Sequence, residues 1–148
     1  MSVSEDLQTY VERLHKRLSI VENKQAIHDL QNQYGFFLDN RMWDEAADLF
    51  CNDSPSMEIG QRGNYIGKER IRKFLVEVLG QGRWGLQKDE IIHHIQLQMV
   101  VTLAEDGQSA KARCRALVQG NSPPGRGHMM LAEGLYENDY VRENDRWA

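Results

Sequence analysis

The hydrophobic periodicity of the chain changes near residue 90, and this change constrains the fold more than any other feature. Before residue 90, apolar side chains recur every three or four residues, which predicts helices. One short strand is predicted between these helices, at 56–60. The predicted helices are 5–18, 20–40, 42–51 and 68–79. After residue 90, apolar and polar side chains alternate, which predicts strands over 91–103, 109–119 and 128–142. Helices followed by consecutive antiparallel strands are typical of an α+β domain with the helices on one face of a curved sheet.

Composition narrows the class of protein further. The 148 residues fit one domain, with 1–19 as a helical arm and 20–148 as the core. A net charge of −4 argues against a nucleic-acid partner. No apolar run approaches the roughly 20 residues of a membrane helix, and the N-terminus lacks the charge and apolar stretch of a signal peptide. Two cysteines, Cys51 and Cys114, are too few for a zinc site and fit a reducing compartment, so a cytoplasmic protein is expected.

Three side chains are candidates for an acid–base site. Tyr34 lies on the apolar face of the second predicted helix, Asp39 lies near its end, and His94 stands at the start of the first long strand. An imidazole, a carboxylate and a phenol together can transfer protons without a metal or a cofactor. On an ideal helix Asp39 is rotated by about 140° from Tyr34, so it reaches a shared pocket only if the helix ends near Leu38. Each of the three also has a structural alternative: a hydrogen-bonded histidine, a solvated aspartate at a helix end and a core tyrosine whose hydroxyl is satisfied.

Four strings in a fixed order carry a family resemblance. They are IHDLQNQY at 27–34 with MWDE at 42–45, GNYIGKERI at 63–71, HHI at 93–95 with AKAR at 110–113, and GLYENDY at 134–140 with DRW at 145–147. Together they span about residues 20–147 and resemble the SnoaL-like branch of the nuclear transport factor 2-like superfamily. The resemblance implies an α+β cone, in which N-terminal helices pack on a curved, mostly antiparallel sheet whose mouth holds a small molecule.

Within that superfamily the chain is most similar to the group of scytalone dehydratase and bile-acid dehydratase. The group's tyrosine stands five residues before its aspartate, as Tyr34 does before Asp39, and its histidine at the start of the long strand matches His94 rather than His93. The resemblance implies that His94, Asp39 and Tyr34 catalyse a cofactor-independent dehydration or cyclisation of a hydrophobic, polyketide- or steroid-like cyclic carbonyl compound. The residues it implies for substrate binding are Tyr136, Cys114, Glu58, Trp43, Met57, Phe37 and Asn138.

Departures from the family pattern keep two alternatives open. Cys114 stands where scytalone dehydratase has a histidine, Glu58 stands where the bile-acid enzyme has a tyrosine, and the family's last strand is lacking. The alternatives are a double-bond isomerase that uses the same pocket and a ligand-binding protein without catalysis. The resemblance also implies a homo-oligomer, a trimer or alternatively a dimer, with the helix at 5–18 as an interface arm. The loop 121–127, with its two prolines and two glycines, is a candidate lid.

Overall fold

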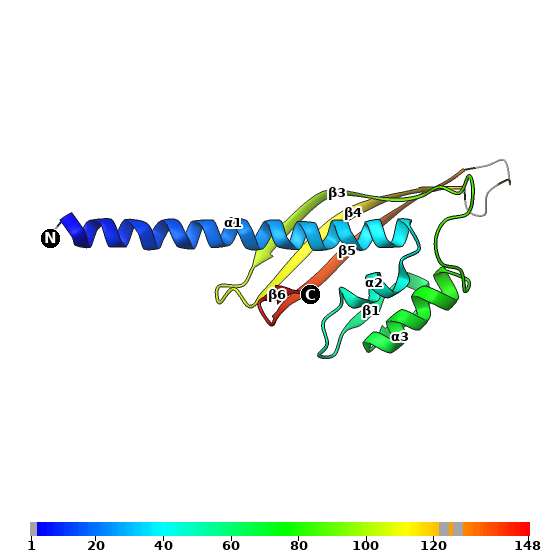
Figure 1. Ribbon diagram of the computed structural model, residues 1–148, viewed down its shortest axis with the longest axis horizontal. Helices are drawn as coiled ribbons and strands as arrows, with labels where there is room; N and C mark the ends of the chain where they lie inside the picture. The colour runs from blue at the N-terminus through cyan, green and yellow to red at the C-terminus, as the bar shows by residue number, and fades with distance from the viewer. Residues whose placement is uncertain (1–2, 122–124, 126–128) are drawn as a thin grey trace.

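The computed structural model describes residues 3–121, 125 and 129–148, and it has the expected α+β architecture (Figure 1). A long helix, α1 (Val3–Asp39), lies along one face of an antiparallel sheet, and a smaller unit lies beside the C-terminal end of that helix. The smaller unit contains α2 (Trp43–Asp48), β1 (Ser56–Glu58), η1 (Gly60–Arg62), β2 (Asn64–Ile66), α3 (Lys68–Lys73) and η2 (Phe74–Leu79). The sheet contains β3 (Ile92–Leu103), β4 (Ser109–Gly120), β5 (Met130–Glu143) and β6 (Arg146–Trp147). Of the described residues, no helix is both long enough and apolar enough to cross a membrane.

The prediction of separate helices over 5–18 and 20–40 was wrong, because α1 is continuous from Val3 to Asp39. Between residues 3 and 34 the sequence contains neither proline nor glycine, so nothing breaks the backbone where the two patterns meet. What looked like two helices are two apolar stripes on different sides of one helix. Only the C-terminal stripe packs against the sheet. The N-terminal half of α1 projects past the sheet (Figure 1).

The inner face of the sheet is lined by alternate side chains of each strand, as strand geometry requires. The strands are ordered β3-β4-β5-β6, with β4 antiparallel to both long neighbours. The small side chains of β4 are buried, and in the register of the sheet each lies opposite a residue of β5. These pairs are Ala110–Tyr140, Ala112–Asn138, Cys114–Tyr136 and Ala116–Gly134. Small residues in the central strand leave room for α1 and for the tyrosines beside it.

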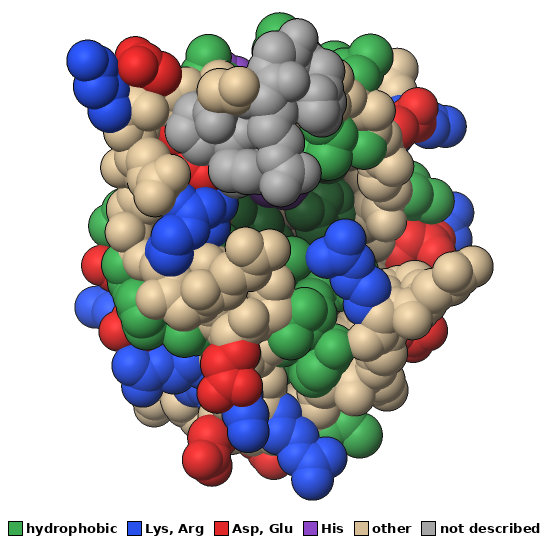
Figure 2. Space-filling model, turned by 90° about the vertical axis from the view of Figure 1, so that its right-hand side faces the viewer, with side chains coloured by type: hydrophobic (Ala, Val, Ile, Leu, Met, Phe, Trp, Pro, Cys, Tyr) green, Lys and Arg blue, Asp and Glu red, His purple; other side chains and the backbone are tan. Residues whose placement is uncertain are grey.

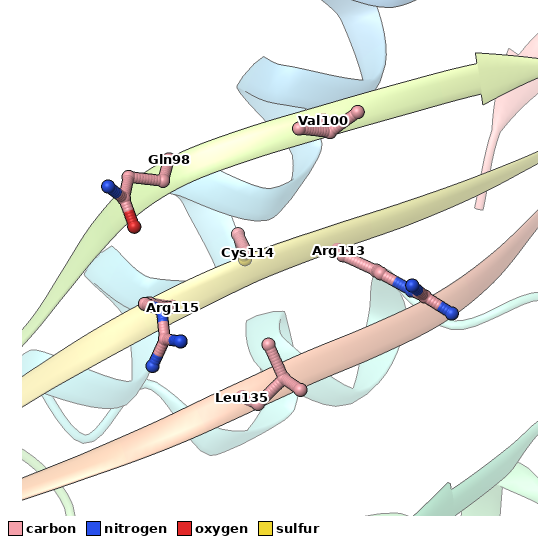
Figure 3. A pocket seen from close by; sticks show the side chains of 6 residues that line it. All are labelled: Gln98, Val100, Arg113, Cys114, Arg115 and Leu135. Carbon is pink, nitrogen blue, oxygen red and sulfur yellow. The ribbon is translucent and has the colours of Figure 1, made fainter.

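The outer face of the sheet is open and charged. Three cross-strand ion pairs join β4 to β5, and their side chains are more than half exposed, so each adds at most about 1 kcal/mol. They are Lys111–Asp139, Arg113–Glu137 and Arg115–Glu133. β3 bulges between Leu97 and Val100, and there a shallow hollow of about 280 Å³ opens between the three strands (Figure 3). The bulge bends β3 and adds to the curvature of the sheet.

Two apolar clusters hold the layers together. One lies between α1 and the sheet and includes Ile27, Val101 and Tyr140. The other fills the smaller unit. Its buried members are Leu38, Trp43, Ala46, Ala47, Met57, Ile71, Phe74 and Leu75. The fourth predicted helix, 68–79, is present, but its second half is the π-helix η2 rather than an α-helix.

Candidate active site

The position of the Asp39 carboxylate follows from the way α1 ends. The chain leaves the helix in a Schellman motif, in which the Met42 N–H donates to the Phe37 carbonyl (2.9 Å) and the Arg41 N–H donates to the Leu38 carbonyl (3.1 Å). Arg41 has the left-handed conformation that this motif needs (φ 55°), which costs a non-glycine residue about 1–2 kcal/mol. The helix therefore stops directly after Asp39, and the Asp39 side chain lies at a helix end rather than on the surface of a continuing helix.

A buried ion pair holds this helix end against the start of β3. The Arg41 guanidinium donates to Glu90 Oε1 at 2.8 Å, and the two side chains are 4% and 0% exposed. Arg83 lies 3.3 Å from the same oxygen, and the Gln87 N–H donates to Glu90 Oε2 at 2.9 Å. Such an interaction stabilises the fold only while both charges and their hydrogen bonds are present. The ion pair with Glu90 also explains how Arg41 is kept in its unfavourable left-handed backbone conformation.

His94 and Asp39 meet directly, as the proposed acid–base site requires. His94 Nδ1 lies 2.7 Å from Asp39 Oδ1, and the His94 backbone N–H donates to the same oxygen at 2.7 Å. Both side chains are 21% exposed. A carboxylate can only accept hydrogen bonds, so Nδ1 of the neutral imidazole carries its proton and Nε2 is the basic nitrogen. The exposed neighbour His93 points to the opposite face of β3.

A glycine allows α1 to approach β3 closely at this point. A Cβ atom on Gly35 would lie 2.9 Å from Gln96 Nε2 and 3.3 Å from the His94 carbonyl oxygen. Gln96 Nε2 itself donates to that carbonyl at 3.1 Å. The helix is therefore packed against the backbone of the candidate base, one helical turn before the carboxylate that contacts its ring.

Two tyrosines stand beside the His–Asp pair. The rings of Tyr34 and Tyr136 are nearly perpendicular, with centroids 6.3 Å apart, and the Tyr34 hydroxyl lies 3.8 Å from Met57 Sδ. Burial and then the nearby Tyr136 raise the pKa of Tyr34. Burial, followed by the charges of Cys114 and Asp39, raises the pKa of Tyr136 to about 12. Both phenols therefore keep their protons at neutral pH and can donate hydrogen bonds to an oxygen atom.

A buried network of polar side chains connects β5 to the backbone of His94. Asn138 and the Tyr140 hydroxyl both donate to Gln31 Oε1 at 2.8 Å. Gln31 Nε2 donates to Gln96 Oε1 at 3.1 Å, and the Cys114 thiol lies 3.4 Å from the same oxygen. Because Gln96 in turn donates to the His94 carbonyl, four elements of the fold contribute to holding the histidine.

The other residues expected at a substrate site fall into two groups. Phe37 and Met57 pack in or against the apolar cluster of the smaller unit, and Met57 reaches the Tyr34 hydroxyl. Trp43 is 3% exposed and belongs to the same apolar cluster. Its Nε1 donates a hydrogen bond to the Arg83 carbonyl at 2.7 Å, in the loop that follows η2. Glu58 is exposed on β1 and points to the face opposite to Met57. In a single chain its side chain therefore does not line the site.

Gln31 and Gln96 are residues of this site that the sequence analysis missed. Each has a signal in the sequence. Gln31 interrupts the apolar face of α1 between Ile27 and Tyr34, and Gln96 alternates onto the same face of β3 as His94. A polar side chain on a buried face needs partners, and these two are partners of each other.

The space-filling view shows a hollow lined by apolar side chains at the end of the molecule where α1 ends (Figure 2). The loop predicted as a lid falls mostly on residues 122–124 and 126–128, outside the described residues. Within the described ranges, no three His, Cys, Asp or Glu side chains gather as a metal site would need.

Solved structures share this fold at low sequence identity. A hexachlorocyclohexane dehydrochlorinase (LinA type 2) superposes with a TM-score of 0.71 at 21% identity, over 88% of this chain and 82% of that chain. A candidate scytalone dehydratase from Novosphingobium aromaticivorans gives 0.72 at 19%, over 87% and 80%. A nuclear transport factor 2-like protein from the same organism gives 0.70 at 18%, over 90% and 81%. At such low sequence identities, these similarities show that the fold is shared and nothing more.

The family is shown by the sequence itself. No curated protein matches the chain significantly. The model of the SnoaL-like domain, however, matches residues 19–148, which include the whole site and all but the projecting part of α1. The chain therefore belongs to the SnoaL-like family.

Proposed function

We propose that this protein is a cofactor-independent lyase that removes water from a hydrophobic cyclic carbonyl compound, with His94 as its acid–base group. The single observation that carries the proposal is the 2.7 Å contact between His94 Nδ1 and Asp39 Oδ1, reinforced by the His94 backbone N–H on the same oxygen. A histidine held in one tautomer by a carboxylate is the arrangement needed for a general base.

In the proposed reaction, Nε2 of His94 takes a proton from the carbon next to the substrate carbonyl. The electron pair of the broken C–H bond moves toward the carbonyl, whose oxygen becomes an enolate. Tyr136 and Tyr34 are suited to donate hydrogen bonds to that oxygen, since burial keeps both phenols protonated. The imidazolium, stabilised by Asp39, then returns its proton to the β-hydroxyl group. The C–O bond breaks, water leaves, and a conjugated double bond forms.

The surroundings favour an apolar substrate. Tyr34 packs edge-to-face on Phe50 (5.9 Å) and on Tyr136, so the two phenols proposed to bind the enolate belong to one aromatic cluster. A neutral hydrophobic molecule is the partner we propose. Among the structures of the same fold, one is named as a dehydrochlorinase and one as a candidate dehydratase, and both names describe eliminations.

Ring closure or double-bond migration would begin with the same proton abstraction, so the product decides between these reactions and dehydration. The test uses β-hydroxy ketones on bicyclic and aromatic rings, together with the matching ketones that lack the hydroxyl group. Enone formation is followed by ultraviolet absorbance, and exchange of the α-hydrogen in D2O is followed by NMR. The matched variants are His94→Ala and His93→Ala, which remove adjacent imidazoles from opposite faces of β3.

We expect enone formation by the wild-type protein, a loss of about 10²- to 10⁴-fold in His94→Ala, and no loss in His93→Ala. Exchange of the α-hydrogen with the hydroxyl group retained, together with migration of the double bond in a matching β,γ-unsaturated ketone, would instead identify an isomerase. Tight binding of these ketones with no exchange in the wild-type protein would contradict catalysis and favour a ligand-binding protein. Equal rates in the two histidine variants would remove His94 from the mechanism.

A further inference from the structure

The N-terminal half of α1 carries an apolar stripe that its own domain does not cover. Residues 6–22 are exposed, and contacts with the sheet begin where Trp147 donates to Asn23 (2.9 Å) and Ile27 becomes buried. The stripe consists of Leu7, Val11, Leu14, Leu18 and Val21, whose exposed fractions run from 39% to 64%. It spans about 21 Å of helix at 1.5 Å per residue.

The spacing of the stripe is that of a coiled-coil seam. Its members follow one another at intervals of four, three, four and three residues, which is the repeat of the a and d positions of a heptad. Val11 and Leu18 take the a positions, and Leu7, Leu14 and Val21 take the d positions. We infer that this stripe pairs, in parallel and in register, with the same stripe of a second copy of the chain.

The charges beside the stripe favour a second copy in the parallel direction. In a parallel pair each g position faces the e position five residues later on the other helix. In such a pair Arg17 would face Glu22 of the second copy, and Lys24 would face Asp29 of the second copy. Each of these two contacts joins a basic to an acidic side chain. In an antiparallel pair g faces g and e faces e. No g position of the stripe is acidic and no e position is Lys or Arg, so the opposite-charge contacts of Arg17 and Glu22 would be lost.

The rest of the fold leaves this pairing unobstructed. The face of α1 that packs on the sheet, through Ile27, Gln31 and Leu38, is rotated by roughly 150° from the stripe. Two stripes can therefore meet while the two sheets face away from each other. A helix this short is marginal alone, but the same helix is already folded on the sheet at its C-terminal end, so the projecting part needs no separate nucleation.

The first test measures the mass of the full chain by sedimentation equilibrium over a series of concentrations. We expect a dimer. The double variant Leu14→Glu/Leu18→Glu should raise its dissociation constant by about hundredfold or more, because it replaces apolar seam contacts by buried carboxylates. The control is Lys16→Glu, which places the same side chain at the outer f position and should leave the mass unchanged. Circular dichroism verifies that every variant is folded.

The second test determines the direction of the helices. Arg17→Glu should weaken a parallel dimer several-fold, and Arg17→Glu/Glu22→Arg should restore it, because the opposite charges face each other again. Leu18→Cys in a Cys51→Ser background should form an intermolecular disulfide on mild oxidation, since a parallel seam brings the two residues together.

A monomer at all concentrations, or a dimer that Leu14→Glu/Leu18→Glu leaves intact, would overturn the inference. Tighter association of Arg17→Glu would overturn the parallel direction, and so would the absence of the Leu18→Cys disulfide in a dimeric sample. None of these outcomes bears on the proposed reaction, because the stripe lies outside the candidate active site.

Discussion

Replacing Asp39 by asparagine separates two things that the carboxylate does for His94. Asp39 Oδ1 accepts two hydrogen bonds, from the ring Nδ1–H and from the backbone N–H, both at 2.7 Å. The Oδ1 atom of an asparagine can accept the same two bonds, whereas the flipped amide would turn its NH2 group toward two donors. We therefore expect Asp39→Asn to keep the geometry and the Nδ1–H tautomer of His94 while removing the negative charge.

The size of the effect can be worked from this geometry. When His94 has taken a proton, its ring charge and the carboxylate charge stand about 4 Å apart, which is worth about 4 kcal/mol at an effective dielectric constant of about 20. Both side chains are 21% exposed, so solvent weakens this attraction somewhat. A loss of about 3–4 kcal/mol of transition-state stabilisation corresponds to a rate reduced by about 10²- to 10³-fold. The free energy of unfolding should change by only about 1 kcal/mol, since both hydrogen bonds persist.

The assay combines three measurements on Asp39→Asn and on Asp48→Asn, a control that removes one exposed carboxylate from the end of α2. The rate of α-hydrogen exchange in a ketone reports catalysis, ¹⁵N-detected NMR of the imidazole reports the tautomer, and urea denaturation reports stability. An undiminished exchange rate in Asp39→Asn would refute the role given to the charge. A wild-type His94 that carries its proton on Nε2 would refute the geometry itself.

Three further predictions concern the surroundings of the site. Glu90→Gln should lower the free energy of unfolding by about 3 kcal/mol in urea denaturation, because it leaves a buried guanidinium without its counter-charge. Burial raises the pKa of Tyr136 from 10.0 to about 12, so its contribution to stability should be complete below pH 10 and lost between pH 10 and 12. Tyr136→Phe should reduce this loss of unfolding free energy without abolishing it, because burial raises the pKa of Tyr140 to about 12 as well. Gly35→Ala should slow the reaction by about tenfold or more with little change in melting temperature, because the new Cβ displaces Gln96 while alanine favours the helix.

The elements of the fold were largely readable in the sequence, and the reasons are local. Alternation sets Tyr136 and Asn138 on one face of their strand, because the side-chain period of a strand is two whatever the strand packs on. The register of the sheet then brings Cys114 opposite Tyr136. The one clear error, the division of α1, came from treating a change of apolar face as a break in the backbone. Periodicity reports which side of a helix is covered, and α1 is covered on one side only beyond Asn23.

The site was less accessible to such reasoning because its geometry depends on contacts between distant parts of the chain. Spacing placed Asp39 off the apolar face, and only the resemblance joined it to His94. The turn that brings it there needs Arg41 in a left-handed conformation, and Arg41 is held by Glu90, which lies 49 residues away in the sequence. No local pattern predicts a strained conformation whose cause is a tertiary ion pair.

The precision of the His–Asp contact therefore rests on where α1 ends. A shift of one residue in the end of the helix would rotate the carboxylate by about 100° and move it about 1.5 Å along the axis, which would abolish a 2.7 Å contact. Three restraints of different kinds oppose such a shift. The Schellman bonds fix the last turn, the Arg41–Glu90 pair ties that turn to β3, and Gly35 fixes the height of the helix against the His94 backbone. None of the three groups needs to touch a substrate, so variants at Gly35 and Glu90 should change catalysis by changing the distance from Asp39 to His94, and structures of those variants should show it.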